Sequence, residues 1–200
     1  MTRNALADPI AQCDPSAPLA ARAAILVVDL EATCSDTDPA FDMETIEIGA
    51  CWVGVDGLVL DRFQSFVRPV VNPQLTAFCT SLIGIRQADI DSAPLFPDAA
   101  AALRDFVSQH QQPGSVWASW GAYDARQIDI DCARHGVENP LADWGHINLK
   151  KEFARVQKIK RVGMKMALSI VGLPLEGKHH SGIDDARNIA RLMPFCFTPS

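Results

Sequence analysis

Apolar and polar positions follow strand periods in the first third of the chain. Residues 24–30 (AILVVDL) form an apolar, β-branched run that is interrupted only by Asp29. Such a run is typical of a strand buried on both faces. Two further strands are predicted over residues 46–55 and 59–67, and the pair Asp56-Gly57 between them predicts a hairpin turn. We therefore expect the sheet to begin with antiparallel strands.

Helical spacing dominates the remainder of the chain. Helices are predicted over residues 76–83, 97–110, 122–135, 147–157, 165–171 and 182–193, with one short buried strand at 115–119. Residues 1–22 have no sustained period and are interpreted as a poorly ordered leader. This order of elements predicts that residues 23–200 form a single α/β domain with a mixed sheet.

The composition adds limits on the class of protein. The 200 residues are 48% hydrophobic, which is enough for a proper core. The six cysteines form no C-x-x-C pair, so neither a zinc ribbon nor a dithiol redox motif is indicated. No apolar run reaches 18 residues and the start of the chain lacks a signal-like segment, so we expect a cytoplasmic protein with no membrane partner. The net charge of −6 argues against a chain that coats nucleic acid through overall basicity.

Four acidic residues occupy positions that a solvated surface does not explain. Asp29 and Glu31 are two residues apart near the end of the most apolar strand, so their side chains share one face. Repulsion and desolvation disfavour two like charges there, and a divalent cation would remove that cost. Asp124 follows the short strand at the start of a helix, where by itself it would favour an interpretation as a helix N-cap or first-turn acid. Asp185 stands at the start of the final helix.

Together these positions resemble the DEDDh superfamily of 3′–5′ exonucleases. The motif elements are Asp29-x-Glu31, Asp124 before a helix, and His180 followed by Asp185 five residues later. Residues 29–34, 44–47, 75–90 and 180–189 are similar to the Eri-type branch, which includes histone-mRNA and siRNA exonucleases. The resemblance extends over residues 24–193. It implies a ribonuclease H-like fold with a mixed central sheet of about five strands flanked by helices.

The same resemblance implies a reaction and a cofactor. We expect a metal-dependent exonuclease that acts on the 3′ end of single-stranded RNA or DNA, with an exoribonuclease favoured. The four carboxylates would bind two divalent ions, and carboxylate oxygens suit Mg²⁺ or Mn²⁺. His180 would be the general base. Two alternatives remain open, namely a hydrolase of dinucleotides or very short oligonucleotides, and a catalytically silent module that binds nucleic acid.

The doubled residues near the end of the chain allow two registers, because His179 and Asp184 are also five residues apart. Only the His180 register places Gly182 and the following residues as the family pattern has them. We therefore assign the catalytic pair as His180 and Asp185. Asp184 is interpreted as the capping-box partner of Ser181, and His179 as a solvated neighbour.

Substrate contacts are implied by resemblance alone at four further positions. Ala32 and Thr33 would meet the terminal nucleotide, and Leu82 would lie beside the last base. Tyr123 would stack on a base, although core packing is an equally open interpretation. Cys34 lacks a predicted partner for thiol chemistry and is interpreted as a small buried residue.

Charge is distributed unevenly along the chain. Residues 1–149 contain eight basic and 20 acidic residues, whereas residues 150–200 contain ten basic and four acidic residues. Seven of the basic residues fall within residues 150–165. This run is interpreted either as a solvated helix face or as a rim that follows phosphates. No heptad pattern or obvious self-complementary stripe predicts an oligomeric state.

Overall fold

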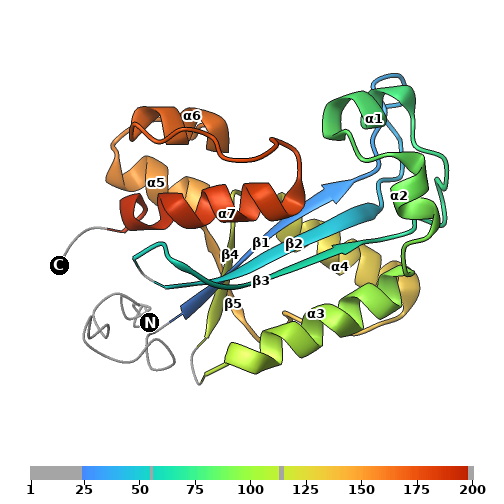
Figure 1. Cartoon of the computed structure of the whole chain (residues 1–200), viewed down its shortest axis with the longest axis horizontal. Helices are drawn as coiled ribbons and strands as arrows, with labels where there is room; N and C mark the ends of the chain where they lie inside the picture. The colour runs from blue at the N-terminus through green and yellow to red at the C-terminus, as the bar shows by residue number, and fades with distance from the viewer. Residues whose placement is uncertain (1–23, 55, 113–114, 198–200) are drawn as a thin grey trace, which may run out of the picture.

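A five-stranded mixed sheet lies at the centre of the structure, a computed structural model that describes residues 24–54, 56–112 and 115–197 (Figure 1). The predicted leader, residues 1–22, lies outside the described residues. The strand order is β3-β2-β1-β4-β5; β1 pairs antiparallel with β2, and β4 pairs parallel with both β1 and β5. The predicted fold class is therefore confirmed. The strands are β1 (Ala24–Ala32), β2 (Thr45–Gly54), β3 (Val59–Phe66), β4 (Val116–Ser119) and β5 (Gly145–Asn148).

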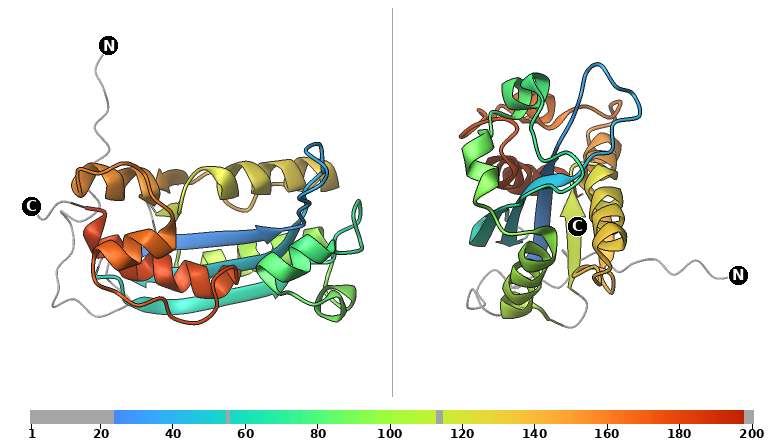
Figure 2. Two further views of the ribbon diagram at one scale, coloured as in Figure 1. Left: turned by 90° about the horizontal axis from the view of Figure 1, so that it is seen from above. Right: turned by 90° about the vertical axis from the view of Figure 1, so that its right-hand side faces the viewer.

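Helices cover both faces of this sheet (Figures 1 and 2). On one face lie α5 (Leu149–Val156), α6 (Met164–Ile170) and α7 (Gly182–Leu192), followed by a 3₁₀ turn at Met193–Phe195. On the other face lie α3 (Phe96–His110) and α4 (Tyr123–His135). The short helices α1 (Ala77–Ile83) and α2 (Gln87–Asp91) lie near the carboxyl end of β1. Among the described segments, no helix has both the length and the apolar character needed to cross a bilayer.

The continuous apolar character of β1 follows from its central position. Ile25 and Val27 belong to the core cluster under α5, α6 and α7, whereas Leu26, Val28 and Leu30 belong to the cluster under α3 and α4. All five side chains are at most 4% exposed. Since successive side chains of a strand point to opposite faces, a strand covered on both sides must be apolar at every core position.

One predicted element is wrong in its type. The helix predicted from residue 147 begins only at Leu149, and Gly145–Asn148 forms strand β5, in which Asn148 lies opposite Ser119 of β4. The Asn148 side chain then caps α5 by accepting a hydrogen bond from the Lys151 backbone N–H at 3.0 Å. Four residues are too few to show a strand period, and the strand exists only because β4 lies beside it. Helix α2 was likewise not predicted, since five residues show no helical period.

Candidate active site

The predicted site acids come from three elements that meet near the carboxyl end of β1. Asp29 and Glu31 lie on β1, Asp124 lies in the first turn of α4, and Asp185 lies in the first turn of α7. Carboxylate oxygens of Asp29, Glu31 and Asp185 lie within 4.8 Å of one another. Asp124 lines the same cavity. Residues more than 150 positions apart in the sequence thus form one acidic cluster.

A contact between two glycines allows α7 to come this close to the strands. Gly49 of β2 is the register partner of Asp29. A Cβ atom on Gly49 would lie 2.1 Å from the backbone carbonyl carbon of Gly182, and one on Gly182 would lie 3.0 Å from the Asp29 carbonyl oxygen. Neither position has room for a side chain. An isolated glycine inside an apolar strand is a signal of close backbone approach, and Gly49 was the signal in the sequence that could have located this contact.

Asp124 is anchored to the same strand end by a backbone hydrogen bond. The Leu30 backbone N–H donates to Asp124 Oδ1 at 3.1 Å. The helix N-cap position belongs to Ala122, so Asp124 is a first-turn acid and not an N-cap. Its carboxylate is 5% exposed and faces β1 instead of solvent.

Glu47 is a further buried acid beside this cluster, and no role was predicted for it. It lies on β2 opposite Glu31 and is 1% exposed. Its Oε1 accepts hydrogen bonds from Gln64 Nε2 at 2.8 Å and from the Ile183 backbone N–H at 3.3 Å. Glu47 therefore satisfies a free N–H group at the start of α7 from a neighbouring strand. Its place between two buried isoleucines, Ile46 and Ile48, was the available signal.

The capping box predicted at the start of α7 is wrong. The Ser181 side chain makes no cap hydrogen bond. Asp184 accepts a hydrogen bond from the Lys178 backbone N–H at 2.8 Å and pairs with Arg187 at 3.2 Å. Asp184 thus holds the preceding loop, and Glu47 supplies the carboxylate at the helix start.

Burial and mutual repulsion dominate the electrostatics of the cluster. Burial, followed by the charges of Asp124 and Glu31, raises the pKa of Asp29 well above its usual range. Burial, followed by the charges of Asp185 and Glu47, raises the pKa of Glu31 to about 8. Burial also raises the pKa of Asp124 and of Asp185. Several carboxylates confined together in this way fit a site for divalent cations, because bound positive charge would offset both effects.

The two neighbouring histidines take different positions. His179 Nδ1 lies 2.9 Å from Asp185 Oδ2, so His179 is held by the cluster and is not the solvated neighbour that was predicted. The His180 ring stacks on that of His179 with 4.0 Å between ring centroids, and its Nδ1 lies 4.0 Å from Glu31 Oε1. The His180 backbone has a φ of 64°, a left-handed conformation that few residues other than glycine adopt. Burial, followed by the charge of His179, lowers the pKa of His180 below 6.5.

A cavity of about 440 Å³ contains these groups, a volume within the range of ligand sites. Ala32, Leu82 and Tyr123 line it, as the resemblance implied. Thr33 is not among the lining residues; it is 1% exposed, and its Oγ1 accepts a hydrogen bond from the Glu44 backbone N–H at 2.9 Å. The Tyr123 hydroxyl is buried and has no hydrogen-bond partner within the described part of the chain.

Cys34 also differs from its predicted environment. It lines the cavity and is only partly buried, and it packs against the apolar cluster that contains Cys79. Burial, followed by the neighbouring Cys79, raises the pKa of the Cys34 thiol to about 12. The expectation of a buried Cys34 is therefore wrong, and the fold also places the thiol of Cys79 beside it, because α1 lies next to the loop that follows β1.

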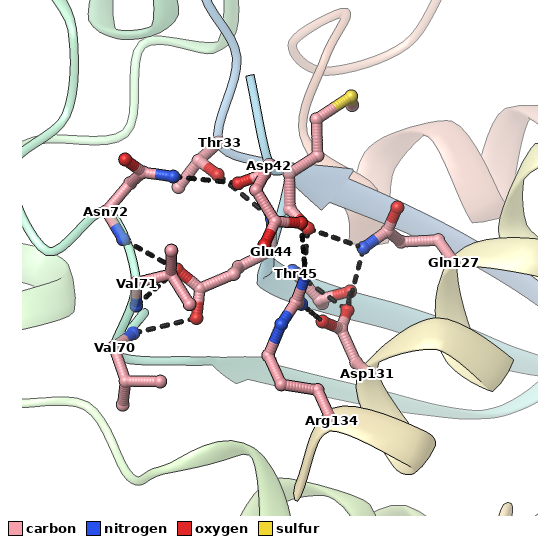
Figure 3. A network of polar contacts seen from close by, with 11 residues as sticks. Thr33, Asp42, Glu44, Thr45, Val70, Val71, Asn72, Gln127, Asp131 and Arg134 are labelled. Carbon is pink, nitrogen blue, oxygen red and sulfur yellow. Dashed lines mark hydrogen bonds and ion pairs between the residues drawn. The ribbon is translucent and has the colours of Figure 1, made fainter. Parts of the chain in front are cut away.

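A second group of buried acids lies at the start of β2, where Glu44 precedes the strand and Asp131 reaches it from α4 (Figure 3). Glu44 accepts backbone hydrogen bonds from Val70, Val71 and Asn72, each at 2.8 Å. Asp131 accepts hydrogen bonds from the Thr45 backbone N–H at 3.1 Å and the Thr45 hydroxyl at 2.7 Å, and from the side chains of Gln127 and Arg134. Both carboxylates are at most 2% exposed. This network therefore holds the start of β2 against α4 and against residues 70–72.

Comparison with known proteins places the chain among nucleases. The Exonuclease family (RNase_T) matches residues 26–193. The 3′-5′ exonuclease eri1 of Schizosaccharomyces pombe is 31% identical over 202 residues, which cover 84% of this chain and 66% of that protein. The 3′-5′ exoribonuclease 1 of Mus musculus is 32% identical over 177 residues, which cover 84% of this chain and 51% of that protein. The chain therefore spans between half and two thirds of the length of these relatives.

Solved structures support the same assignment. The nuclease domain of 3′hExo, described as a DEDDh family member bound to rAMP, superposes with a TM-score of 0.78 at 31% identity, covering 86% of this chain and 90% of that domain. Cell-death related nuclease 4 superposes with a TM-score of 0.76 at 22% identity, covering 84% of this chain and 62% of that chain, and supports the fold alone.

Proposed function

Because this chain belongs to the Exonuclease family, in its Eri-type DEDDh branch, we propose that it removes nucleotides from the 3′ end of single-stranded RNA by metal-dependent hydrolysis of phosphodiester bonds. One observation carries the proposal: Asp29, Glu31 and Asp185 converge within 4.8 Å beside His180 in a cavity of nucleotide-binding scale. A purely structural role would leave this group of like charges uncompensated.

The chemistry of the donors supports a divalent cation as cofactor. Asp29, Glu31 and Asp185, with Asp124 beside them, would hold two Mg²⁺ or Mn²⁺ ions, since these hard cations prefer carboxylate oxygens. When bound, such ions supply the positive charge that favours hydroxide over water and stabilises the leaving oxygen. The raised pKa of Glu31, about 8, makes binding compete with protons, so activity should increase with pH in the neutral range.

His180 is proposed to accept the proton from the attacking water. Its lowered pKa keeps the imidazole neutral at neutral pH, and a neutral ring nitrogen can accept a proton. Its side chain is 38% exposed at the mouth of the cavity and lies 4.0 Å from Glu31. His179, which is bonded to Asp185, would orient that carboxylate.

RNA is proposed as the substrate because the relatives in mouse, rat and human carry the name 3′-5′ exoribonuclease 1. One neighbouring structure is titled for 3′-end recognition of the histone mRNA stem-loop by a 3′-exonuclease. An enzyme that selects RNA must contact the 2′-hydroxyl group, which is the feature that separates it from DNA. Matched RNA and DNA oligomers of one sequence therefore provide a direct comparison.

The test uses 5′-labelled single strands incubated with Mg²⁺ or Mn²⁺, with and without EDTA. The proposal expects a metal-dependent ladder that shortens from the 3′ end, and faster shortening of RNA than of DNA. Retained binding without degradation would favour the silent module, and cleavage of dinucleotides alone would favour the short-substrate hydrolase. Faster degradation of DNA would overturn the choice of RNA.

The two histidines provide a matched pair for the assignment of the base. His180→Ala should lower kcat roughly 100-fold or more, which is the usual contribution of a general base. His179→Ala should have a smaller effect on kcat, together with weaker metal binding. The reverse ranking would show that the wrong register was assigned.

A further inference from the structure

The two ends of the cavity differ in chemistry. One end is lined by Ala32, Cys34 and Met43 and by Leu82 and Ile83 of α1. The other end is lined by Trp120, Lys150 of α5, and Gly163, Met164 and Lys165 at the start of α6. Helix α1 and the α5–α6 pair lie at opposite ends of the molecule in Figure 1 and in the left view of Figure 2. The four acids of the cluster line the same cavity.

The α1 end has the properties of a base-binding surface. Leu82 is 42% exposed, whereas Ile83 beside it is 3% exposed and packs into the apolar cluster with Cys79. An apolar side chain held on a rigid support and open to the cavity suits the face of a base. The ammonium of Lys178 lies beside Gly84 at the end of α1, but Lys178 is not among the lining residues.

The α5–α6 end has the properties of a phosphate-binding surface. Lys150 and Lys165 are the lysines among the cavity-lining residues. Within the described ranges, neither ammonium donates a hydrogen bond or forms an ion pair of 4.0 Å or less, whereas Arg155 of the same basic run pairs with Glu152 at 2.8 Å. Lys150 is partly buried, and its charge counteracts the raised pKa of Asp124. Two cations without close partners at one end of an acidic cavity are available for phosphate oxygens.

We propose that Lys150 and Lys165 bind the phosphates on the 5′ side of the scissile bond, so that the strand leaves the active site across α5 and α6. This inference rests on the proposed function. The 3′-terminal nucleotide contributes one base and the scissile phosphate, and the acidic cluster with its cations takes that phosphate. Every further phosphate belongs to the remainder of the strand, on the 5′ side of the scissile bond. The end of the cavity that carries the two lysines therefore binds this part of the strand.

Three other residues of the basic run extend this path. Lys158, Lys160 and Arg161 lie between α5 and α6 and are exposed. Lys151, one position beyond Lys150, is exposed but does not line the cavity, because neighbouring helix positions point about 100° apart. The path predicts that affinity increases with strand length over the first few nucleotides and does not depend on base sequence.

The test compares Lys150→Ala and Lys165→Ala with Lys151→Ala as the matched control, on a 5′-labelled RNA decamer and an RNA dinucleotide. We expect the ratio of kcat/KM for the decamer to that for the dinucleotide to fall roughly tenfold in each cavity variant. The ratio for Lys151→Ala should match that of the wild type. Lys150→Arg should restore most of the ratio, because the guanidinium also binds phosphate.

Binding supplies a readout that does not require turnover. In an Asp29→Asn background, the slope of log affinity for the decamer against log salt should become shallower by about 0.7 for each lysine removed. Equal losses on decamer and dinucleotide, or a Lys151→Ala variant as impaired as Lys150→Ala, would overturn the inference. If the wild type hydrolyses neither substrate, the proposed function fails, and the salt slopes still decide whether the lysines bind phosphate.

Discussion

Glu31, Asp124 and Asp185 of the active site are buried, as Glu44 and Asp131 of the neighbouring network are, and Asp29 is partly buried. The two groups differ in what surrounds their carboxylates. Glu44 and Asp131 each accept hydrogen bonds from at least three donors, and Asp131 also pairs with Arg134 (Figure 3). Glu31 accepts no hydrogen bond from the described residues, and its near neighbours include Asp185 and Glu47. Burial of a carboxylate therefore does not by itself identify a catalytic group.

The supply of donors separates Glu31 from Glu44 and Asp131. A buried carboxylate surrounded by N–H and O–H groups is satisfied by the protein and stabilises the fold. A buried carboxylate surrounded by other carboxylates holds its proton or requires a cation from solution. The same substitution, Asp to Asn, should therefore remove activity but not stability at Asp29, and remove stability but not activity at Asp131.

The largest expected effect is the loss of activity in Asp29→Asn. Removal of a cation-binding charge should lower kcat at least about 1000-fold, which corresponds to several kcal/mol of transition-state stabilisation. The metal-free melting temperature should stay equal or increase, because a like charge is removed. Radiolabelled RNA assays and calorimetry on the same sample would check both, and a variant of normal activity would exclude Asp29 as a ligand.

Asp131→Asn should produce the converse result. Loss of the buried ion pair with Arg134 should cost about 3 kcal/mol of unfolding free energy, or roughly 6–12 °C in melting temperature. At a temperature where the variant is folded, kcat should stay within about threefold of the wild type. A loss of activity comparable to that of Asp29→Asn, in a fully folded sample, would contradict the separation of the two groups.

Metal addition should increase the stability of chains in which the active-site acids are intact, and it should do so whether or not Asp131 is replaced. Saturation with Mn²⁺ or Mg²⁺ at about 100 times the dissociation constant should add about 2.7 kcal/mol to the stability of the wild type, reversed by EDTA. Asp131→Asn should show the same gain, whereas Asp29→Asn should show little. An equal gain in Asp29→Asn would place the ion elsewhere.

The smallest expected effect is a pH dependence of the metal-free chain. Glu31 has an ordinary pKa of 4.5, which the fold raises to about 8. Between these values the unfolded chain is ionised while the folded chain retains the proton, so stability falls as the pH rises. Glu31→Gln removes this penalty, and its melting temperature relative to the wild type should therefore increase over that window by roughly 3–5 °C for each pH unit. A difference in melting temperature that does not change with pH would show that the fold does not raise the pKa of Glu31.

Much of the fold could be predicted from short-range pattern. The strand β1, the hairpin-linked strands β2 and β3, and the helices α3, α4 and α7 follow from period and from start and stop signals, which are local properties of the chain. The strand β5 and the helix α2 could not be predicted, because each is too short for a period and depends on a neighbour that is distant in sequence.

The sequence by itself determined which residue types were available for chemistry: the four motif acids, the two histidines and the basic run at residues 150–165. The tertiary structure decided which of them share one cavity, which acid is satisfied by donors, and which lysine of an adjacent pair lines the site. The physical reason is distance. A charge is recognisable from its residue type, but its pKa and role depend on burial and on groups within a few ångströms, and the contact of Gly49 with Gly182 brings those groups together.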